Sequence, residues 1–352
     1  MIPATPDDIT PSWLSAALAA AGFPVVRATT LERLGEDDSV TGFVYRVRLG
    51  FDGGTVGPAP SVVVKLPMST DSRSEIFRQF YQREVAFYRE LAPTLGELVP
   101  QAYFSEIDET SGDYVLILED FPHLRPGRND PPATGGEALT MVRQMATLHA
   151  TWWNSPALHA HSFLGTEEVF IARMAGIVRD RLGTFMDRFE ADLSPGLRRV
   201  YRAFATGFEA ASEPLLHAPS TLVHHDLSLK NTLVGGTTDD HAIVLIDWQL
   251  VSAAPGVRDV SFFVENSVRP ATGISEQELL VVYRDGLVER GVRDYSLAQL
   301  TDHYRRSVLV DLARVVAFGS QPTPRPMVFD IARHELAGRA TADEDLALLE
   351  LL

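Results

Sequence analysis

The sequence predicts an α+β fold with two lobes, a small lobe that is mainly an antiparallel sheet and a larger lobe that is mostly helical. Three observations support this prediction. Short apolar runs typical of strands concentrate before residue 121. Residues 122–136 are rich in Pro, Gly and Asp, which indicates a loop. Beyond that loop, apolar residues recur mostly at helical spacing. We therefore expect one lobe over residues 1–121 and the other over residues 122–352.

The first lobe should contain one N-terminal helix and five strands. The pair Thr10-Pro11 is a helix start signal, because proline is favoured in the first turn, and the helix is expected over residues 8–21. Two strands around a turn are expected within residues 25–47. The other three strands are expected at residues 61–66, 101–106 and 114–120.

Two charged residues of this lobe stand where apolar ones are expected. Residues 61–66 read S-V-V-V-K-L, so Lys65 ends a valine run and shares a strand face with Val63. Residues 74–91 predict an amphipathic helix whose apolar stripe includes Glu84. Since a buried lysine and a buried carboxylate each need a partner, Lys65 and Glu84 are expected to form an ion pair. The alternative for Lys65 is an edge strand, where lysine discourages aggregation.

The second lobe should be built from helices with recognisable start signals. Ser194-Pro195 begins one helix, and Ser275 with Glu278 and Ser296 with Gln299 are capping boxes that begin two others. The expected helices cover residues 138–153, 166–189, 194–211, 275–291, 296–318 and 331–351.

Residues 221–251 carry the chemistry of the chain. They hold two apolar runs, each ending at a polar cluster: H-H-D-L-S-L-K-N from His224 to Asn231, and D-W-Q from Asp247. Magnesium prefers oxygen ligands, which Asn231 and Asp247 can supply. Asp226 is then free to orient an attacking hydroxyl or to accept its proton. In phosphoryl transfer, one Asp acts on the nucleophile, whereas an Asn and a second Asp bind the metal.

The order and spacing of these residues resemble a known family. H-x-D-x-x-x-x-N at His224, Asp226 and Asn231, followed by an apolar strand and Asp247, is similar to the core of the aminoglycoside phosphotransferase and choline kinase-like superfamily. D-W-Q is closer to its ecdysteroid kinase-like branch than to the D-F-G of protein kinases. The resemblance implies a protein kinase-like fold and an enzyme that transfers the γ-phosphoryl group of ATP, with Mg²⁺, to a hydroxyl of a small molecule.

The same resemblance implies which residues bind the nucleotide. Lys65 would hold the α- and β-phosphates, and Glu84 would hold Lys65. The turn near Ser39 and Gly42 would be the phosphate loop, although a full G-x-G-x-x-G is absent and two acids sit at its tip. A plain hairpin turn is the alternative there.

The resemblance also implies roles around the adenine and the catalytic loop. Backbone groups of Glu119 and Phe121 would pair with the adenine. Lys230, between the base and a metal ligand, could touch the transferred phosphoryl group. His149 is expected to be a buried, hydrogen-bonded histidine. Asp259 is expected to cap a helix and brace the catalytic loop, with a role on the substrate side as the alternative.

Two other classes of function stay open at this point. His224, His225, Asp226 and Asp247 could form a transition-metal site of a hydrolase, because neutral imidazole suits Zn or Fe. A non-catalytic nucleotide-binding protein, a pseudokinase acting as a scaffold, is the other alternative. Protein kinase activity is disfavoured by D-W-Q and by the lack of an A-P-E-like segment after it.

Composition excludes several partners and chemistries. The formal net charge of −16 argues against nucleic acid and anionic membrane surfaces and would suit a cationic substrate. The absence of cysteine excludes disulfides and thiolate catalysis and fits a reducing, cytoplasmic setting. No apolar run approaches the roughly 20 residues of a membrane span, and the N-terminus does not resemble a signal peptide.

Overall fold

The computed structural model describes residues 2–35, 42–53, 57–67, 75–235, 242–268, 272–321 and 347–352, and the statements below concern these residues. The chain forms two compact units. The small unit comprises Met1–Arg125, Leu233–Gly235 and Val244–Leu250, and the larger unit comprises Pro126–Thr232, Gly236–Ile243 and Val251–Leu352. The sequence places the boundary after residue 121. The structure divides the chain at Arg125 instead and assigns the segment that carries Asp247 to the small unit.

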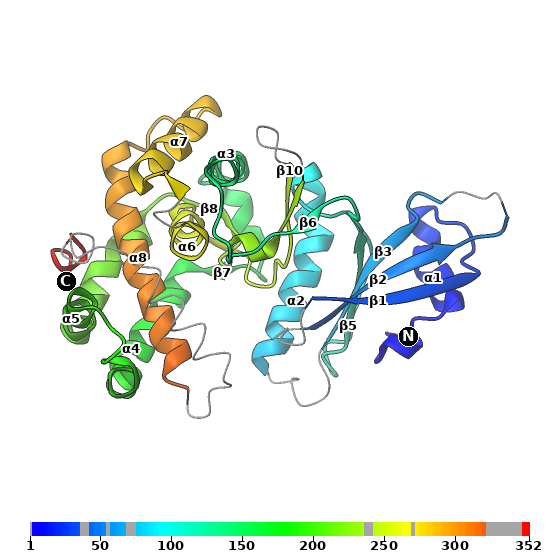
Figure 1. The fold of residues 1–352 in the computed structure, drawn as a ribbon, viewed down its shortest axis with the longest axis horizontal. Helices are drawn as coiled ribbons and strands as arrows, with labels where there is room; N and C mark the ends of the chain where they lie inside the picture. Colours follow the sequence, from blue (N-terminus) through cyan, green and yellow to red (C-terminus); the bar gives the residue numbers. More distant parts are fainter. Residues whose placement is uncertain are drawn as a thin grey trace. The chain divides into compact units, whose positions relative to one another are not determined.

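The small unit is built on the predicted antiparallel sheet of five strands (Figure 1). The strand order is β1-β2-β3-β5-β4, and each pair of neighbours is antiparallel. Because β3 is the central strand, Lys65 does not lie on a sheet edge, and the edge-strand alternative is wrong. The elements are α1 Pro11–Leu18, β1 Ala28–Leu34, β2 Gly42–Gly50, β3 Ser61–Pro67, α2 Glu75–Glu90, β4 Ala102–Ile107 and β5 Tyr114–Glu119.

Side chains alternate along β3, so apolar residues pack on one face of the sheet and Lys65 makes its polar contact on the other. Val64 and Leu66 pack in one hydrophobic core with Leu14 of α1. Lys65, between them in the sequence, meets Glu84 of α2. Successive residues of a strand point to opposite faces, so α1 and α2 cover opposite faces of β3. The sheet therefore delivers one charged side chain to the α2 side while it keeps its other face apolar.

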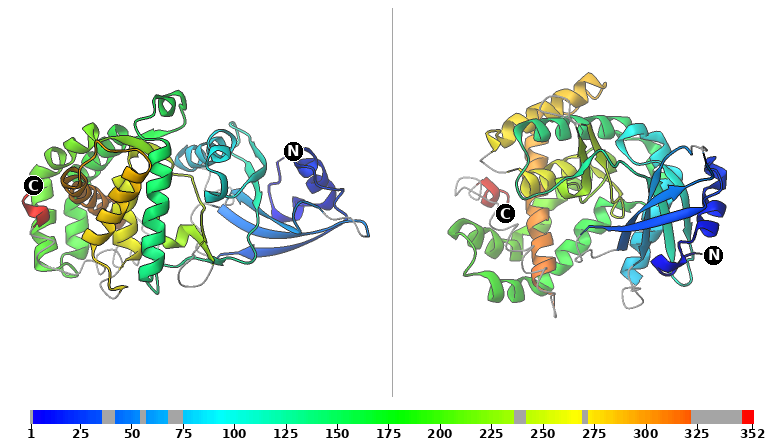
Figure 2. Two further views of the ribbon diagram at one scale, coloured as in Figure 1. Left: turned by 90° about the horizontal axis from the view of Figure 1, so that it is seen from above. Right: turned by 45° about the vertical axis from the view of Figure 1, so that its right-hand side comes forward.

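The larger unit consists mostly of helices, as the sequence predicts. Each of the predicted start residues Ser194, Ser275 and Ser296 accepts a hydrogen bond from a backbone N–H of the first turn, and both capping boxes are present. The helices are α3 Gly135–Thr151, α4 Glu167–Phe189, α5 Pro195–Ser212, α6 Val257–Ser267, α7 Glu276–Glu289 and α8 Leu297–Gly319. Helix α8, orange in Figure 2, packs against α4, α5, α6 and α7. The helix expected over residues 331–351 lies largely outside the described residues.

Short strands and 3₁₀ helices connect these elements. Two three-stranded sheets have the orders β7-β11-β8 and β10-β9-β6. Their strands are β6 Arg125–Pro126, β7 Gly165–Thr166, β8 Ser220–Val223, β9 Thr232–Gly235, β10 Ala242–Leu245 and β11 Ser252–Pro255. The 3₁₀ helices are η1 Pro6–Asp8, η2 Ala19–Ala21, η4 Ala92–Thr94, η5 Gly96–Leu98, η6 Pro156–Ala160, η7 Glu213–His217 and η8 Leu229–Asn231. Strand β8 leads into the loop of residues 224–228, and its neighbour β11 leads into α6. In the described ranges, no helix has the length and apolarity that crossing a bilayer requires.

Candidate active site

The first cluster of functional side chains lies in the small unit and is centred on Lys65. Its ammonium nitrogen Nζ is 2.8 Å from Glu84 Oε1 and 2.7 Å from Asp247 Oδ1. The Lys65 and Glu84 side chains are 9% and 1% exposed, whereas Asp247 is 27% exposed. The predicted ion pair is therefore present, and Asp247 adds a second carboxylate on the solvent side of the lysine.

Burial and the neighbouring charges both shift the pKa values of Lys65 and Glu84. Burial alone would lower the pKa of Lys65, but the negative charges of Asp247 and Glu84 outweigh it and hold that pKa well above its usual value. Burial raises the pKa of Glu84 to about 6; Lys65 opposes this shift, and the charge of Asp247 adds to it. Lys65 therefore keeps its charge, and its ammonium group, beside the partly exposed Asp247, could donate to an anionic ligand such as a phosphate group.

Helix α2 and the D-W-Q segment hold each other in place. Phe87, one helical turn after Glu84, stacks on Trp248 with ring centroids 4.2 Å apart and an angle of 10° between the planes. Trp248 is fully buried, and its indole N–H donates to the Leu245 carbonyl. Asp247 has a left-handed backbone with φ of 69°, which few non-glycine residues adopt. The aromatic stack therefore fixes a strained residue so that its carboxylate reaches Lys65.

The residues predicted to bind the rest of the nucleotide are placed as follows. Ser39 lies outside the described residues. Gly42 begins β2, where a Cβ atom would approach the Leu66 carbonyl oxygen to 2.7 Å, so close strand pairing explains this glycine. At the end of β5, the Glu119 N–H donates to the Gln101 carbonyl, and the Phe121 carbonyl accepts from the Leu124 N–H. The Glu119 N–H and the Phe121 carbonyl therefore already have hydrogen-bond partners within the protein.

The second cluster, in the larger unit, contains the proposed base. Asp226 follows β8 in a loop, and Asn231 ends the 3₁₀ helix η8. The Asn231 side-chain amide donates to the Asp226 carbonyl at 2.7 Å and to Asp226 Oδ2 at 2.9 Å. Lys230 has an exposed side chain, and its backbone N–H donates to Asn129 Oδ1. The structure thus brings Asp226 and Asn231 together directly.

Asp259 braces the loop from α6. One of its carboxylate oxygens accepts the His225 N–H at 2.8 Å, and the other accepts the His224 N–H at 2.8 Å. The second oxygen also lies 3.3 Å from His149 Nε2, and the His149 ring is fully buried as predicted. The bracing role is confirmed. The capping role is wrong, because no side chain caps α6 and Asp259 points at the loop instead.

The family of the chain follows from a comparison with known proteins. The model of the ecdysteroid kinase-like family matches residues 36–293, which is more than half of the chain. The chain belongs to the ecdysteroid kinase-like family. A comparison with curated proteins found no match.

Solved structures similar to this ecdysteroid kinase-like chain share its fold. An ethanolamine kinase of Plasmodium vivax is 11% identical with a TM-score of 0.57, over 93% of this chain and 86% of that one. A choline/ethanolamine kinase family protein of Mesorhizobium loti is 15% identical with a TM-score of 0.53, over 98% and 99%. The GDP complex of wild-type aminoglycoside 2'-phosphotransferase-IIIa is 15% identical with a TM-score of 0.54, over 96% and 97%. The predicted two-lobed kinase-like fold is therefore confirmed.

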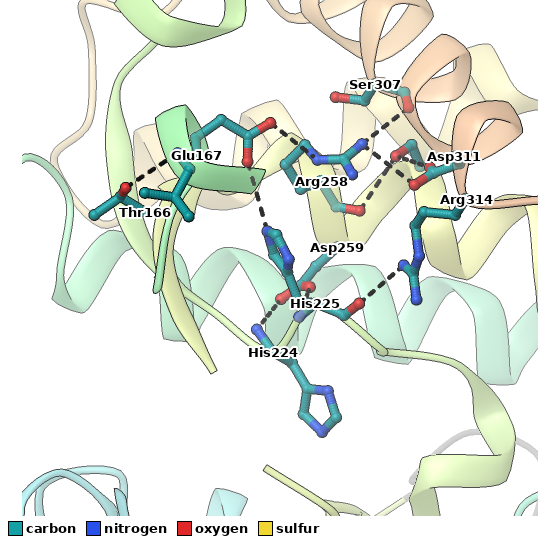
Figure 3. A network of polar contacts seen from close by, with 11 residues as sticks. Thr166, Glu167, His224, His225, Arg258, Asp259, Ser307, Asp311 and Arg314 are labelled. Atoms are coloured by element: carbon teal, nitrogen blue, oxygen red, sulfur yellow. Dashed lines mark hydrogen bonds and ion pairs between the residues drawn. The ribbon is translucent and has the colours of Figure 1, made fainter. Parts of the chain in front are cut away.

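A buried charge network, which the sequence patterns did not predict, lies behind the loop of this family member. We define it as Glu167, His225, Arg258 and Asp311. Glu167 contacts His225 Nε2 at 3.6 Å and Arg258 Nε at 3.3 Å, and Arg258 contacts Asp311 at 3.2 Å (Figure 3). Burial would raise the pKa of Glu167, but the charges of Arg258 and His225 outweigh it and lower that pKa. No pattern in the sequence indicated the partners of Arg258, because they lie on α4 and α8.

The donor atoms of two predicted metal ligands suit Mg²⁺. The Asn231 amide nitrogen is used by Asp226, so its oxygen Oδ1 is the atom that could bind a cation. Asp247 offers a partly exposed carboxylate. Oxygen donors from an amide and a carboxylate are the chemistry that Mg²⁺ prefers.

The alternative transition-metal site is not supported by the positions of its residues. The His225 ring faces Glu167, whereas the Asp226 N–H donates to His224 Nδ1. Within the described part of the chain, no three His, Asp or Glu side chains are grouped so that they could hold a metal ion. The two histidines instead orient the loop.

Proposed function

We propose that this protein is an ATP- and Mg²⁺-dependent phosphotransferase that moves the γ-phosphoryl group of the nucleotide to a hydroxyl of a small molecule. The observation that carries the proposal is the buried Lys65, bound by Glu84 on one side and by the partly exposed Asp247 on the other. Similar structures include an ethanolamine kinase and an aminoglycoside 2'-phosphotransferase, and these activities agree with the proposed reaction class.

In this proposal the small unit binds the nucleotide. Lys65 keeps its charge and is held in position by Glu84, so it can donate to phosphate oxygens. The Lys65–Asp247 contact would lengthen when phosphates bind, since both the lysine and the carboxylate then gain ligands. With the Glu119 N–H and the Phe121 carbonyl already used, the nucleobase would depend on the Glu119 carbonyl and the Phe121 N–H. Ser39 and Gly42 stay proposed phosphate-loop contacts.

The larger unit supplies the base for the acceptor. Asp226 would hold the acceptor hydroxyl and take its proton while the acceptor oxygen bonds to the γ-phosphorus. The bond from that phosphorus to the bridging oxygen breaks, and ADP leaves with the electron pair. Asn231 fixes one oxygen of Asp226 and so directs the other toward the hydroxyl. Lys230, exposed beside this pair, is a proposed contact of the transferred group.

Asn231 and Asp247 would hold the magnesium ion, which would neutralise charge on the β- and γ-phosphates when bound. Asp247 has a second partner in Gln249, whose Nε2 is 3.4 Å from Asp247 Oδ2. This contact keeps the carboxylate plane oriented when Lys65 turns to phosphate.

The proposal is tested first by calorimetric titration with ATP and with GTP, each with and without Mg²⁺. Asp226→Asn should bind the nucleotide as wild type does, and it should lose ADP release by about 100-fold or more because the base is removed. Asp247→Asn should weaken Mg²⁺-dependent binding itself. Asp285→Asn, an exposed carboxylate on α7 paired with its neighbour Arg284, is the matched control and should change neither quantity.

ADP release should be screened over hydroxylated amines, aminoglycosides, sterols and sugars, because the acceptor defines the enzyme. Wild-type turnover in Asp226→Asn would contradict the assigned base. Magnesium-dependent nucleotide binding without ADP release for any acceptor, including water, would show a nucleotide-binding protein without catalysis. Absence of nucleotide binding would overturn the proposal as a whole.

A further inference from the structure

Arg314 reaches the catalytic loop from a part of the chain that the motifs do not cover. It lies on α8, beyond residues 36–293 that match the family model. Its side chain is 10% exposed, and its guanidinium carbon lies 4.1 Å from the centre of the Phe262 ring on α6. This stacking fixes the plane of the guanidinium group. Figure 3 shows Arg314 directed toward the backbone of His225.

The Arg314 guanidinium contacts both the backbone and the side chain at the proposed base. Its Nη1 donates to the His225 carbonyl at 3.0 Å, and its Nη2 lies 3.6 Å from Asp226 Oδ1. The His225 carbonyl belongs to the peptide group that joins His225 to Asp226. The N–H of the same peptide group donates to His224 Nδ1 at 3.3 Å. Both ends of the peptide that carries Asp226 are therefore held, one by Arg314 and one by His224.

The backbone at this point needs such support. His225 has φ of 66°, in the left-handed region that a residue with a Cβ atom rarely adopts. Strained residues of this kind persist when the surrounding contacts determine their conformation. Asp259 holds the amide on the N-terminal side of His225. Arg314 holds the carbonyl on the C-terminal side of His225, so the direction in which the Asp226 side chain projects from the loop depends on Arg314.

The two oxygens of the Asp226 carboxylate have different neighbours. Oδ2 accepts from Asn231 Nδ2 at 2.9 Å, and Oδ1 faces Arg314. The pair of contacts restricts rotation of the carboxylate about its bond to Cβ. A planar guanidinium group with several N–H donors can serve the carbonyl and the carboxylate at once, whereas a lysine ammonium on the same helix has no such geometry.

We infer that Arg314 is a positioning residue that fixes the Asp226 peptide and carboxylate for transfer, an inference that rests on the proposed phosphotransferase function. It acts through Asp226 and not on the nucleotide or the acceptor. Its removal should therefore lower kcat and leave the KM for MgATP nearly unchanged. Since a displacement of about 1 Å can cost about 100-fold in rate, we expect Arg314→Ala to reduce kcat by about 10- to 100-fold.

Arg306 provides the matched control on the same helix. It lies about two turns before Arg314, and it donates to Asp302 and to the Ala211 carbonyl. Arg306→Ala removes a partly buried arginine that ties α8 to its surroundings without touching the loop. If Arg314 only stabilised α8, the two alanine variants should lose stability and activity to a similar extent.

The experiment measures ADP release from MgATP for the full-length protein, with water as acceptor and with any acceptor found by screening. Guanidinium at millimolar concentration should restore part of kcat in Arg314→Ala, since it can occupy the vacated position, whereas urea should not, because it carries no charge. Arg314→Lys, which keeps the charge and most of the apolar stem, should have intermediate kcat and serves if the alanine variant does not fold. Unchanged kcat in both Arg314 variants would overturn the inference.

Hydrogen exchange of the backbone separates this inference from the proposed function. Exchange at the amides of residues 225–231 should accelerate in Arg314→Ala and stay unchanged in Arg306→Ala. If the wild-type protein releases no ADP, the phosphotransferase proposal fails, and the exchange measurement still decides whether Arg314 holds the loop. Equal exchange in the two variants would refute the positional role.

Discussion

Replacing Asp259 by asparagine is the most direct test of how the loop is held. The carboxylate is fully buried and faces three donors, which are two backbone N–H groups at 2.8 Å and His149 Nε2 at 3.3 Å. Asparagine has the same shape, but only one of its two terminal atoms accepts a hydrogen bond. Whichever way the amide turns, its NH₂ group must face at least one backbone N–H of His224 or His225.

The loss of stability can be estimated from these contacts. A buried donor left without an acceptor costs about 1–3 kcal/mol. The remaining hydrogen bonds become neutral, and charge-assisted bonds are roughly twice as strong as neutral ones. Together the change should lower the unfolding free energy by about 2–4 kcal/mol, which is large for a substitution that removes no volume.

Scanning calorimetry measures this loss directly. A loss of about 3 kcal/mol should lower the Tm of the larger unit by about 9 °C, at roughly 3 °C per kcal/mol for a unit of this size. Asp52→Asn, at an exposed carboxylate that pairs with Arg27, is the control and should shift the Tm by less than about 1 °C because exposed ion pairs contribute little. A shift for Asp259→Asn as small as that of the control would refute the reasoning that the carboxylate holds the loop.

Three further predictions concern Gly42, Gly183 and the stability of the protein in acid. Gly42→Ala should destabilise the small unit by about 1–3 kcal/mol, because its Cβ atom would meet the Leu66 carbonyl at 2.7 Å; Gly183→Ala, exposed on α4 with no neighbour near its Cβ position, should stabilise by about 0.5–1 kcal/mol in urea unfolding. Burial opposes ionisation of Asp259, but hydrogen bonding and charge from His149 and His224 outweigh it and lower its pKa. The Asp259 carboxylate therefore stabilises the folded protein at pH values above its usual pKa of 3.8, and this stabilisation is lost as the pH falls through its folded-state pKa. Wild type should consequently lose more stability in acid than Asp259→Asn.

Local sequence patterns predicted much of the fold. The capping boxes at Ser275 and Ser296 act between residues three positions apart, so the helix starts could be located without knowing the rest of the fold. The alternation of β3 placed Lys65 apart from its apolar neighbours for the same reason. Composition added the strongly acidic charge and the absence of cysteine.

One long-range contact was also predictable. Lys65 and Glu84 were each out of place in an apolar pattern, and a buried charge requires an opposite charge. Because these two unmatched charges lie close together in the sequence, each one predicted the other as its ion-pair partner. The structure added Asp247 to this pair from 182 positions away, and that third member had no equivalent pattern in the sequence.

The environment of the proposed base was predicted only in part. Asp226 and Asn231 are close in the sequence and could be paired by spacing, and Asp259, which reaches His225 from 34 positions away, was expected to brace the loop, but Arg314 reaches His225 from 89 positions away and was not expected. Arg314 lies on a helix whose polar residues would look ordinary on a solvated face. A periodic pattern reports only which side of a helix is buried. The positions of two packed helices in space decide which of their charged residues meet. The sequence alone therefore determined the elements and the reactive residues, whereas packing determined what holds those residues in place.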